Sequence, residues 1–406
     1  MTGPPVAEAN LRAYALHQRA VGSLFWLPTV FLYLIDQVGL SRALQLGALY
    51  YLTVVVLEVP SGWFSDRVGR VTALRVTAIA WVATNVLFLL GGSWPIAGAQ
   101  FLFAVGYAFL SGTDTTFHFD TLDGAGRAGE FERREAAVRR GMLVATAGSA
   151  LVGGALAFVD MRLPFAASLI AALVQFVATT RMAEPPRTGR TEGLTADLGA
   201  VLRSLRRPML AWVTLYVVVE VILIHLVSEL APPYLTMVLE RPDDDPAGAA
   251  VIAGVVAAGV ALVGAAALRH IDTARVRLGA GVVLIALALA SATTMVLMAS
   301  ISSLWVVPAI AFRGVQAAAT SVLVPGVVAR RVEQQHRATT LSVTSLAGRC
   351  GYAIVLLSLA RVAGDVFSDV LDLAAVVAAA SAMVALGVAL LPSVARELGA
   401  EREASR

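Results

Sequence analysis

Hydrophobic and polar residues occur in long alternating blocks along this chain. Most apolar blocks are close to the roughly 20 residues that a helix needs to cross the hydrocarbon core of a bilayer. The intervening polar segments are mostly short. The pattern predicts twelve membrane-spanning helices, at about residues 20–40, 43–62, 71–91, 95–117, 140–158, 163–180, 209–239, 248–268, 276–298, 303–328, 338–364 and 370–392.

Composition agrees with a membrane protein. Of the 406 residues, 58% are hydrophobic and 15% are charged, whereas a soluble domain is about 45–50% apolar. The segment Met1–Asn10 lacks the basic region and small-residue cleavage site of a signal peptide, so we expect the first span to be retained. Cys350 is the only cysteine, which excludes an internal disulfide and a cysteine-based metal cluster.

The 31 basic residues are all arginine, and their positions predict the orientation of the chain. Arginines are concentrated in the loops that follow even-numbered spans, and basic loops stay on the cytoplasmic side. We therefore expect a multi-pass protein of the inner membrane with both termini in the cytoplasm. The orientation of the chain in the membrane accounts for these arginine clusters, so we do not expect nucleic-acid binding. The main clusters are Arg67, Arg70 and Arg75; Arg127, Arg133, Arg134, Arg139 and Arg140; Arg181 to Arg207; Arg269 to Arg277; and Arg330 to Arg337.

A polar stretch from Arg181 to Pro208 divides the spans six plus six. It contains Pro185-Pro186 and a segment, Leu194 to Leu205, that we expect to lie amphipathically on the membrane surface. The prediction is an all-α protein of two pseudo-symmetric six-helix bundles, residues 1–181 and 209–392, joined by a cytoplasmic linker at 182–208 and followed by a tail at 393–406. Duplicated halves that rock around a central site are a recurrent transporter plan. We expect a monomer.

The segment Gly62-Trp63-Phe64-Ser65-Asp66-Arg67-Val68-Gly69-Arg70 fits the pattern GxxxD(R/K)xGR at each defined position. This chain therefore resembles the major facilitator superfamily, over roughly residues 15 to 392. In that family the loop latches the two halves together on the cytoplasmic side. The residue types predict a close helix approach at Gly62, a tight turn at Gly69 and a carboxylate at Asp66 that accepts bonds from arginines or from a helix N-terminus.

Other segments resemble a subgroup of bacterial drug or metabolite exporters. They are Glu58 to Gly62, Ser111 to Asp114 and Arg337 to Ser342. Two departures weaken assignment as a proton-coupled drug antiporter: Leu102 stands where those proteins usually have an arginine, and Ser149 to Gly154 lacks their Gly-Pro pair.

Ionisable residues inside the predicted spans are candidates for function, because a charge near the bilayer centre is costly. Glu220 shares a helical stripe with Trp212 and Tyr216, which favours a cavity wall with a protonatable carboxylate over a structural ion pair. Arg313 should either pair with a carboxylate or bind an anionic substrate group. For Asp114 and Glu58 we favour pairing with nearby arginines (Arg70, Arg75, Arg139 and Arg140). For Asp36, His118 and Asp120 we expect solvated or capping roles.

A second group lies farther along. His225 and Glu229 share one face of span 7, where they either pair, pass a proton or, with less support, bind a metal. Pro232-Pro233 should break or kink the same helix. Arg349 is expected to pair with a carboxylate or a carbonyl.

The resemblance implies a cavity lined by the first and fourth helices of each half. Aromatic stripes in membrane helices often serve packing alone, but polar residues recur here at comparable depth. The candidate lining residues are Trp26, Thr29, Tyr33, Gln100, Phe103, Tyr107, Ser111, Trp212, Tyr216, Glu220, Arg313 and Gln316.

These features predict secondary active transport of a small amphipathic organic molecule, with export driven by proton entry. Glu220 is the first candidate for proton coupling, followed by Asp114 and Glu58. The sequence contains no phosphate-binding or hydrolase motif. We therefore expect no catalytic activity, no bound metal and no cofactor. The alternatives are nutrient uptake or uniport without proton coupling, and a non-transporting sensor or scaffold on the same fold.

Overall fold

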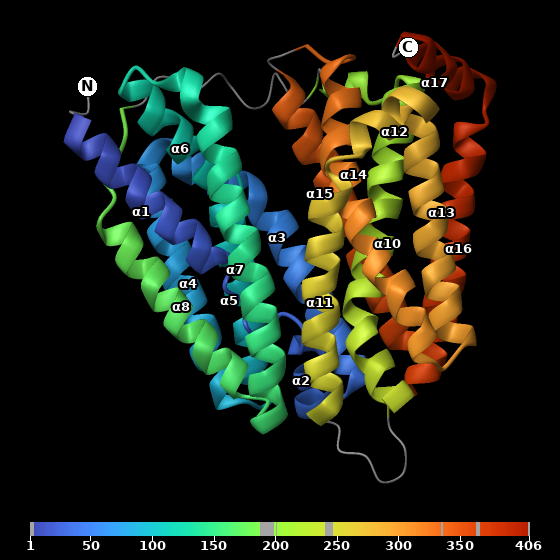
Figure 1. Cartoon of the computed structure of the whole chain (residues 1–406), viewed down its shortest axis with the longest axis horizontal. Coiled ribbons are helices and arrows are strands. Elements are labelled where there is room, and N and C mark those ends of the chain that lie inside the picture. The colour runs from blue at the N-terminus through green and yellow to red at the C-terminus, as the bar shows by residue number, and fades with distance from the viewer. Residues whose placement is uncertain are drawn as a thin grey trace. The chain divides into compact units, whose positions relative to one another are not determined.

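The computed structural model describes residues 4–186, 199, 201–239, 247–333, 336–362 and 366–404. Within these residues every regular element is a helix, as predicted (Figure 1). About half of the predicted linker, residues 187–198 and 200, lies outside the described residues, and the position of the segment Leu194 to Leu205 on the membrane surface stays a prediction. The helices are α1 (Pro4–Gly22), α2 (Val30–Val38), α3 (Leu40–Val68), α4 (Arg70–Leu90), α5 (Ser93–Leu110), α6 (Thr113–Gly124), η1 (Ala128–Glu130), α7 (Phe131–Val159), α8 (Leu163–Thr180), α10 (Pro208–Leu239), α11 (Ala247–Ala267), α12 (Ile271–Leu278), α13 (Ala280–Ser300), η2 (Leu304–Val306), α14 (Val307–Ala329), α15 (Arg337–Val362), α16 (Phe367–Ala389) and α17 (Pro392–Ala404).

Eleven helices among the described residues are long and apolar enough to cross a membrane. Helices satisfy their own backbone hydrogen bonds, which is why apolar segments of this length adopt them in lipid. The predicted span without a counterpart among these eleven helices is the first, at residues 20–40. There α1 ends at Gly22 and α2 begins at Val30, with turns between them. Pro28 lies within these turns.

Two further boundaries differ from the prediction. Span 4 is interrupted at Ser111 and Gly112, where Gly112 adopts a left-handed conformation (φ 75°) between α5 and α6. Glycine has no Cβ and so adopts this conformation readily. In contrast, α10 continues through Pro232 and Pro233 to Leu239, so these prolines do not break span 7, and the alternative of a kink stays a prediction.

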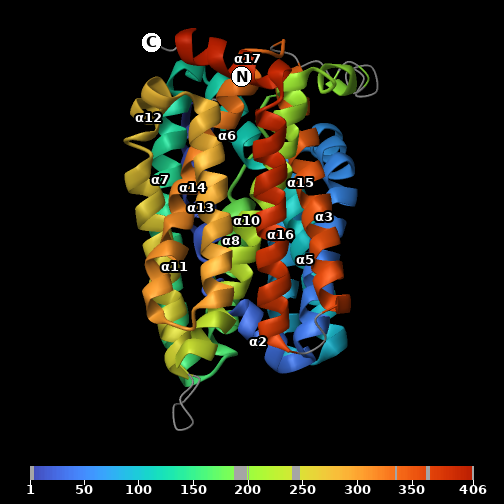
Figure 2. The same cartoon turned by 90° about the vertical axis from the view of Figure 1, so that its right-hand side faces the viewer.

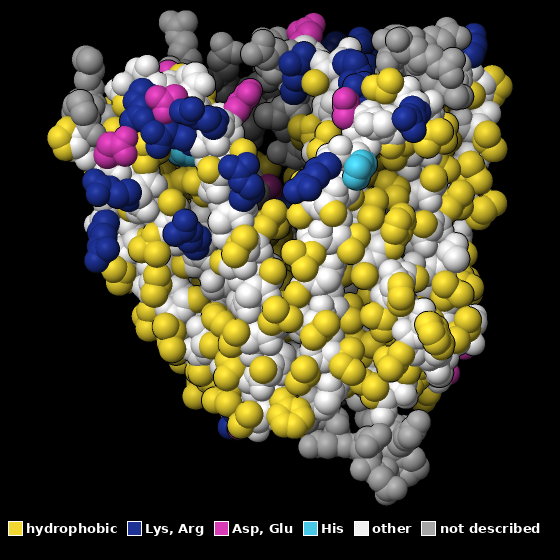
Figure 3. All heavy atoms as spheres, in the orientation of Figure 1, with side chains coloured by type: hydrophobic (Ala, Val, Ile, Leu, Met, Phe, Trp, Pro, Cys, Tyr) yellow, Lys and Arg dark blue, Asp and Glu magenta, His cyan; other side chains and the backbone are white. Residues whose placement is uncertain are grey.

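The chain forms two compact units, each built from three segments of the sequence. Unit 1 contains residues 1–39, 49–191 and 245–258. Its helix α4 packs against α5 and α8, and α1 packs against α7 and α8. The core includes Tyr14, Leu74 and Phe117, all with fully buried side chains. Charged side chains collect at one end of this unit, over α6 and the start of α7, whereas hydrophobic side chains cover its sides (Figure 3).

An ion-pair cluster orders that charged end. Arg127 donates to Glu8 on α1 (2.6 Å) and to Glu130 (2.9 Å), and Arg134 also donates to Glu130 (2.8 Å). The hydrogen bond from Arg127 lowers the pKa of Glu8 below its usual range. The cluster ties the N-terminal helix to the start of α7.

Unit 2 contains residues 40–48, 192–244 and 259–406. Its helix α10 packs against α15 and α16, and α13 packs against α14 and α16 (Figure 2). The start of α3 belongs to this unit, where Ser41 Oγ donates to the carbonyl of Ala360 (2.9 Å). Trp212 and Tyr234 of α10 are fully buried. Helix α10 is thus the central helix of unit 2.

Candidate functional site

The break between α1 and α2 is built into unit 1 by two neighbouring helices. The backbone N–H of Phe25, which has no helical acceptor, donates to Ser168 Oγ on α8 (2.9 Å). On the other side, α7 approaches so closely that a Cβ at Gly153 would overlap the Phe25 carbonyl. Irregular backbone at membrane depth is tolerated only where protein buries it or where it lines a cavity, and discontinuous helices often form transporter binding sites.

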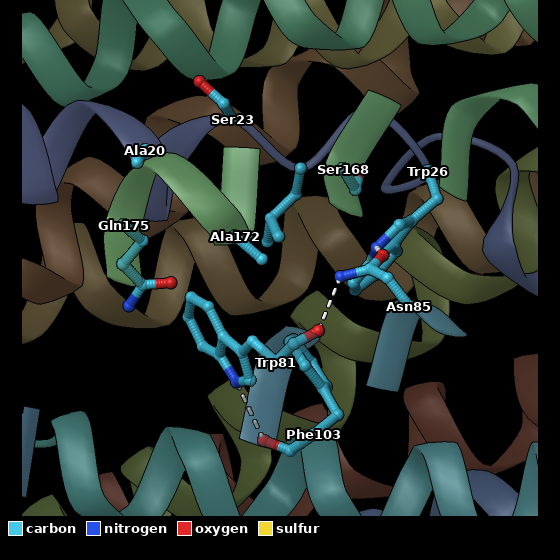
Figure 4. Close-up of a pocket in the computed structure, with 10 residues that line it drawn as sticks. Ala20, Ser23, Trp26, Trp81, Asn85, Phe103, Ser168, Ala172 and Gln175 are labelled. Carbon is cyan, nitrogen blue, oxygen red and sulfur yellow. Dashed lines mark hydrogen bonds between the residues drawn. The ribbon is translucent and has the colours of Figure 1, made fainter. Parts of the chain in front are cut away.

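A small pocket lies beside this break (Figure 4). Trp26 Nε1 donates to Asn85 Oδ1 (3.1 Å), and Asn85 Nδ2 donates to the carbonyl of Trp81 (2.8 Å). Trp81 Nε1 in turn donates to the carbonyl of Phe103 (3.3 Å). The pocket thus combines aromatic surfaces with oriented amides, and its volume of about 10 Å³ is room for about one water molecule. Its lining residues are Ala20, Ser23, Leu24, Trp26, Trp81, Asn85, Phe103, Ser168, Ala172 and Gln175.

Trp26 and Phe103 are predicted lining residues that meet at this pocket, with ring centroids 5.1 Å apart. Thr29 and Tyr33 do not line it. Both are buried, and Tyr33 donates to the carbonyl of Phe88 (2.6 Å). Gln100 is buried on α5 as well. The Tyr107 ring lies 6.3 Å from that of Tyr50. Substrate contact by these residues stays a prediction.

Asp114 lies in the first turn of α6 and is buried. Its Oδ2 accepts a hydrogen bond from Gln18 Nε2 of α1 (2.5 Å) and forms a longer ion pair with Arg139 Nη2 of α7 (3.5 Å). Its Oδ1 accepts from the backbone N–H of Thr115 (2.7 Å). Asp114 therefore has the arginine partner that we expected, although Arg70 and Arg75 are not among its partners.

A second carboxylate, Glu135 of α7, extends this network. It accepts from Arg139 Nε (2.7 Å) and from Tyr14 OH (3.1 Å), and its Oε2 lies 2.7 Å from His118 Nδ1. Gln18 Nε2 also donates to Tyr14 OH (3.2 Å), which links Glu135 to Asp114. The residues Tyr14, Gln18, Asp114, His118, Glu135 and Arg139, from α1, α6 and α7, are called here the α6 polar network.

The expected solvated role of His118 is wrong, because its side chain is buried and faces Glu135. Glu135, Gln18 and Tyr14 were not predicted as site residues. Glu135 and Arg139 have the four-residue spacing of a helical ion pair, and that signal was available in the sequence. Nothing in the sequence places Tyr14 and Gln18 beside them.

Glu58 and Ser111 also come together in unit 1. Ser111 Oγ donates to Glu58 Oε1 (2.9 Å). One turn along α3, Ser61 Oγ donates to the carbonyl of Ala108 (2.8 Å). These bonds join α3 to the end of α5, directly before the break at Gly112.

The segment Gly62 to Arg70 is helical as far as Val68, and only Gly69 turns the chain (φ 135°). Arg70 binds Asp66 (2.8 Å) and Asp120 of α6 (2.7 Å), so Asp66 accepts from an arginine as predicted. Asp120 is buried in this ion pair, which corrects its expected solvated role. Within unit 1 no described atom beyond the backbone of its own helix would lie within 4 Å of a Cβ at Gly62, so no other helix of that unit approaches closely there. A close approach to the other half stays a prediction.

Glu184 explains how α4 begins. It accepts from the backbone N–H groups of Arg70 (2.6 Å) and Val71 (3.0 Å), which are two donors that a helix start leaves without partners. Arg67 lies over the ring of Trp63 (4.9 Å). The role of the segment as a latch between halves stays a prediction.

In unit 2 the predicted stripe on α10 is buried. Glu220 is 7% exposed, and Trp212 and Tyr216 are fully buried. Tyr216 OH lies 3.3 Å from Thr320 Oγ1 of α14, and the carboxyl group of Glu220 lies near the same threonine. Trp212 Nε1 donates to the carbonyl of Ala385 (3.1 Å). Among the described residues, no basic side chain forms an ion pair with Glu220.

Gln316 and Arg313 lie on α14. Gln316 is fully buried, and its Oε1 accepts from Ser291 Oγ of α13. Arg313 forms no ion pair with any described carboxylate, and its buried Nε has no hydrogen-bond partner. The structural pairing that we considered for Arg313 is therefore absent from the described part of the chain. The ring of His225 lies 5.2 Å from that of Tyr352.

The fold and these buried polar groups define the class: a polytopic all-α membrane transporter. A model of the Major Facilitator Superfamily matches residues 20–356, and the chain belongs to that family. It is therefore a secondary transporter rather than an enzyme.

Solved structures with the same fold include several transporters. The chain is similar to a point mutant of the nucleoside transporter NupG (13% identity, 94% of this chain and 99% of that chain covered, TM-score 0.78). It is also similar to a D-xylose-proton symporter (13%, 96% and 99%, TM-score 0.69) and to a bacterial homologue of the iron transporter ferroportin (16%, 96% and 100%, TM-score 0.65). A search of curated proteins finds no significant match.

Proposed function

We propose that this transporter exports a small amphipathic organic molecule in exchange for protons, and that Glu220 is the main coupling group. The observation that carries the proposal is the environment of Glu220. It is buried in α10, it lies near the hydroxyl of Thr320, and it forms no ion pair with a described basic residue. A buried carboxylate without a counter-ion is costly, and binding a proton removes that cost.

The other predicted coupling residues are weaker candidates. Asp114 already has a hydrogen-bond donor in Gln18 and a counter-ion in Arg139. Glu58 accepts a hydrogen bond from Ser111. We therefore rank Glu220 first, Asp114 second and Glu58 third, which is also the order that the sequence predicts.

Protonation would couple to transport through the conformational equilibrium. A proton on Glu220 changes the relative free energies of inward-open and outward-open states only if the carboxyl environment differs between them. If the substrate also binds better to one of these states, its movement across the membrane becomes coupled to that of the proton. The two then move in the same direction or in opposite directions, depending on which state each one favours. The side chains beside Trp26 are aromatic rings and amides, the kinds that line sites for organic molecules, and a conformation that admits substrate there must widen the pocket.

The test begins with purified full-length protein. A thermal-shift screen against drugs, sugars, peptides and metabolites, at a mildly acidic and a mildly alkaline pH, would provide a ligand for flux assays in proteoliposomes. We expect an imposed proton gradient to drive ligand movement by the wild type and by Asp272→Asn, whose carboxylate is exposed on α12. Glu220→Gln should keep ligand binding but lose gradient-driven movement.

Each outcome has a consequence for the proposal. Gradient-driven flux that persists in Glu220→Gln would reject Glu220 as the coupling group. Wild-type flux that is unchanged when an ionophore collapses the gradient would favour uniport. Flux in the same direction as the protons would favour proton-driven uptake.

A further inference from the structure

Three basic side chains from three helices come together inside unit 2. Arg313 of α14 and Arg349 of α15 both lie close enough to His225 of α10 to act on it electrostatically. Helices α10 and α15 pack tightly here, because a Cβ at Gly348 would lie 2.8 Å from the side chain of Val221. Each of the three residues lies near the middle of its candidate span, in Pro208–Leu239, Leu304–Ala329 and Thr339–Val362. We call Arg313, Arg349 and His225 the basic cluster.

Arg313 is the member of this cluster without a counter-ion among the described residues. Its Nε is buried and makes no hydrogen bond. An arginine keeps its charge at any accessible pH, so it cannot avoid the cost of burial by losing a proton. Intramembrane charges that persist at such a cost generally mark substrate or ion sites.

Other arginines of the chain show what structural roles look like. Arg70 and Arg139 lie between carboxylates. Arg75 also has a buried Nε without a partner, but it lies within two turns of the start of α4. Arg313 differs from all three because it combines mid-span depth with the absence of a described carboxylate partner.

The surroundings of Arg313 indicate what it would bind. Thr320 follows seven residues later on the same face of α14, about two turns away, and it contacts Glu220 and Tyr216. Arg313 therefore lies at one end of a polar strip along α10 and α14, and Thr320 and Glu220 lie at its other end. A guanidinium binds carboxylates through two parallel N–H bonds.

We propose that Arg313 binds the carboxylate of the transported molecule, so that the substrates of this protein are small organic anions. The inference rests on the proposed function that the chain transports a small organic molecule, and it narrows the class of that molecule. The unmatched charge of Arg313 is then neutralised whenever substrate is bound.

The first experiment needs no ligand. In purified full-length protein in phosphatidylcholine nanodiscs, Arg313→Gln should raise the thermal unfolding temperature, because it removes a buried charge without a partner. Arg275→Gln is the control, since Arg275 pairs with Asp272 on α12 outside the spans. A lower unfolding temperature for Arg313→Gln would mean that Arg313 has a structural partner, and would overturn the proposal.

The second experiment measures anion binding in the same nanodiscs. The probes are benzoate, phenylacetate and hexanoate, each compared with its neutral amide. We expect the wild type and Arg275→Gln to bind at least one carboxylate in preference to its amide. Arg313→Gln should weaken that binding by about tenfold to a hundredfold, with Arg313→Lys in between because it keeps the charge but loses the paired N–H groups.

Two results would overturn the assignment. In the first, the wild type binds none of the carboxylates in preference to its amide. In the second, Arg313→Gln keeps the preference of the wild type. A lipid headgroup is tested by adding phosphatidylglycerol to the discs. If that lipid stabilises the wild type but not Arg313→Gln and no soluble carboxylate binds, the site is a lipid site and the substrate proposal is wrong. Binding is measured without flux, so a failure of proton coupling in proteoliposomes leaves this result intact.

Discussion

At the scale of single residues, buried polar groups of unit 1 are satisfied by partners on other helices. Glu135 connects α7 to Tyr14 of α1 and to His118 of α6. Each of these partners would lose its acceptor if the carboxylate were removed, and a buried polar group without a partner costs more than the hydrogen bond itself contributes. Glu135 is therefore expected to hold three helices together.

This reasoning gives a stability prediction for Glu135→Ala. The variant should lower the free energy of unfolding by about 1–3 kcal/mol, measured by titration with sodium dodecyl sulfate in mild detergent. Glu132→Ala, on an exposed position of the same helix, is the control and should change little. Equal effects of the two substitutions would show that the α6 polar network contributes nothing to stability.

The sequence predicted some of these residues and missed others for a physical reason. Asp114, Arg139 and Arg70 were identified because charges inside or beside apolar spans are conspicuous. His118 was assigned to water because it follows a predicted span end, whereas α6 continues to Gly124 and buries it. Tyr14 and Glu135 are 121 residues apart, and no local pattern encodes such a contact.

At the scale of elements, hydropathy located the spans but not the interruptions within them. A window of about 20 residues averages over the turn at residues 23–29 and over the single glycine at 112. At Pro232 and Pro233 the sequence allowed either a break or a kink, and α10 continues there as a helix. Interruptions depend on partners such as Ser168, which supplies the acceptor for the backbone of Phe25, and those partners lie elsewhere in the sequence.

The break after α1 depends on the absence of a side chain at Gly153. In Gly153→Ala the new methyl group would overlap the Phe25 carbonyl, so backbone must shift. We expect a loss of about 1–3 kcal/mol in stability and a reduced transport rate. Gly148→Ala on the same helix has open space around it and should be neutral or stabilising by up to about 1 kcal/mol.

The two alanine variants can be compared by their unfolding free energies in detergent. If Gly153→Ala is as stable as Gly148→Ala, the close approach of α7 to the break is not present in the protein. If it is destabilised but transports normally, the break has a structural role and no part in transport.

At the scale of the whole molecule, the distribution of arginine predicts which ends of the helices face the cytoplasm. The chain is convenient for testing this, because Cys350 is its only cysteine. In a Cys350→Ser background, new cysteines can be placed at exposed positions at both ends of the spans. Ser93 is at the start of α5 and Ser302 lies shortly before α14, and both are in loops that follow odd-numbered predicted spans. Arg133 and Asp272 lie beside loops that follow even-numbered predicted spans.

We expect a membrane-impermeant maleimide to label Ser93→Cys and Ser302→Cys in intact cells. Arg133→Cys and Asp272→Cys should react only after the membrane is permeabilised, because basic loops are retained in the cytoplasm. Each pair contains one position from the first six predicted spans and one from the last six, so the four sites test both halves with the same reagent. A uniform reversal would mean that the arginine pattern does not set the orientation. Opposite results within a pair would mean that the two halves do not share one topology, and a transport cycle based on duplicated bundles would then fail as well.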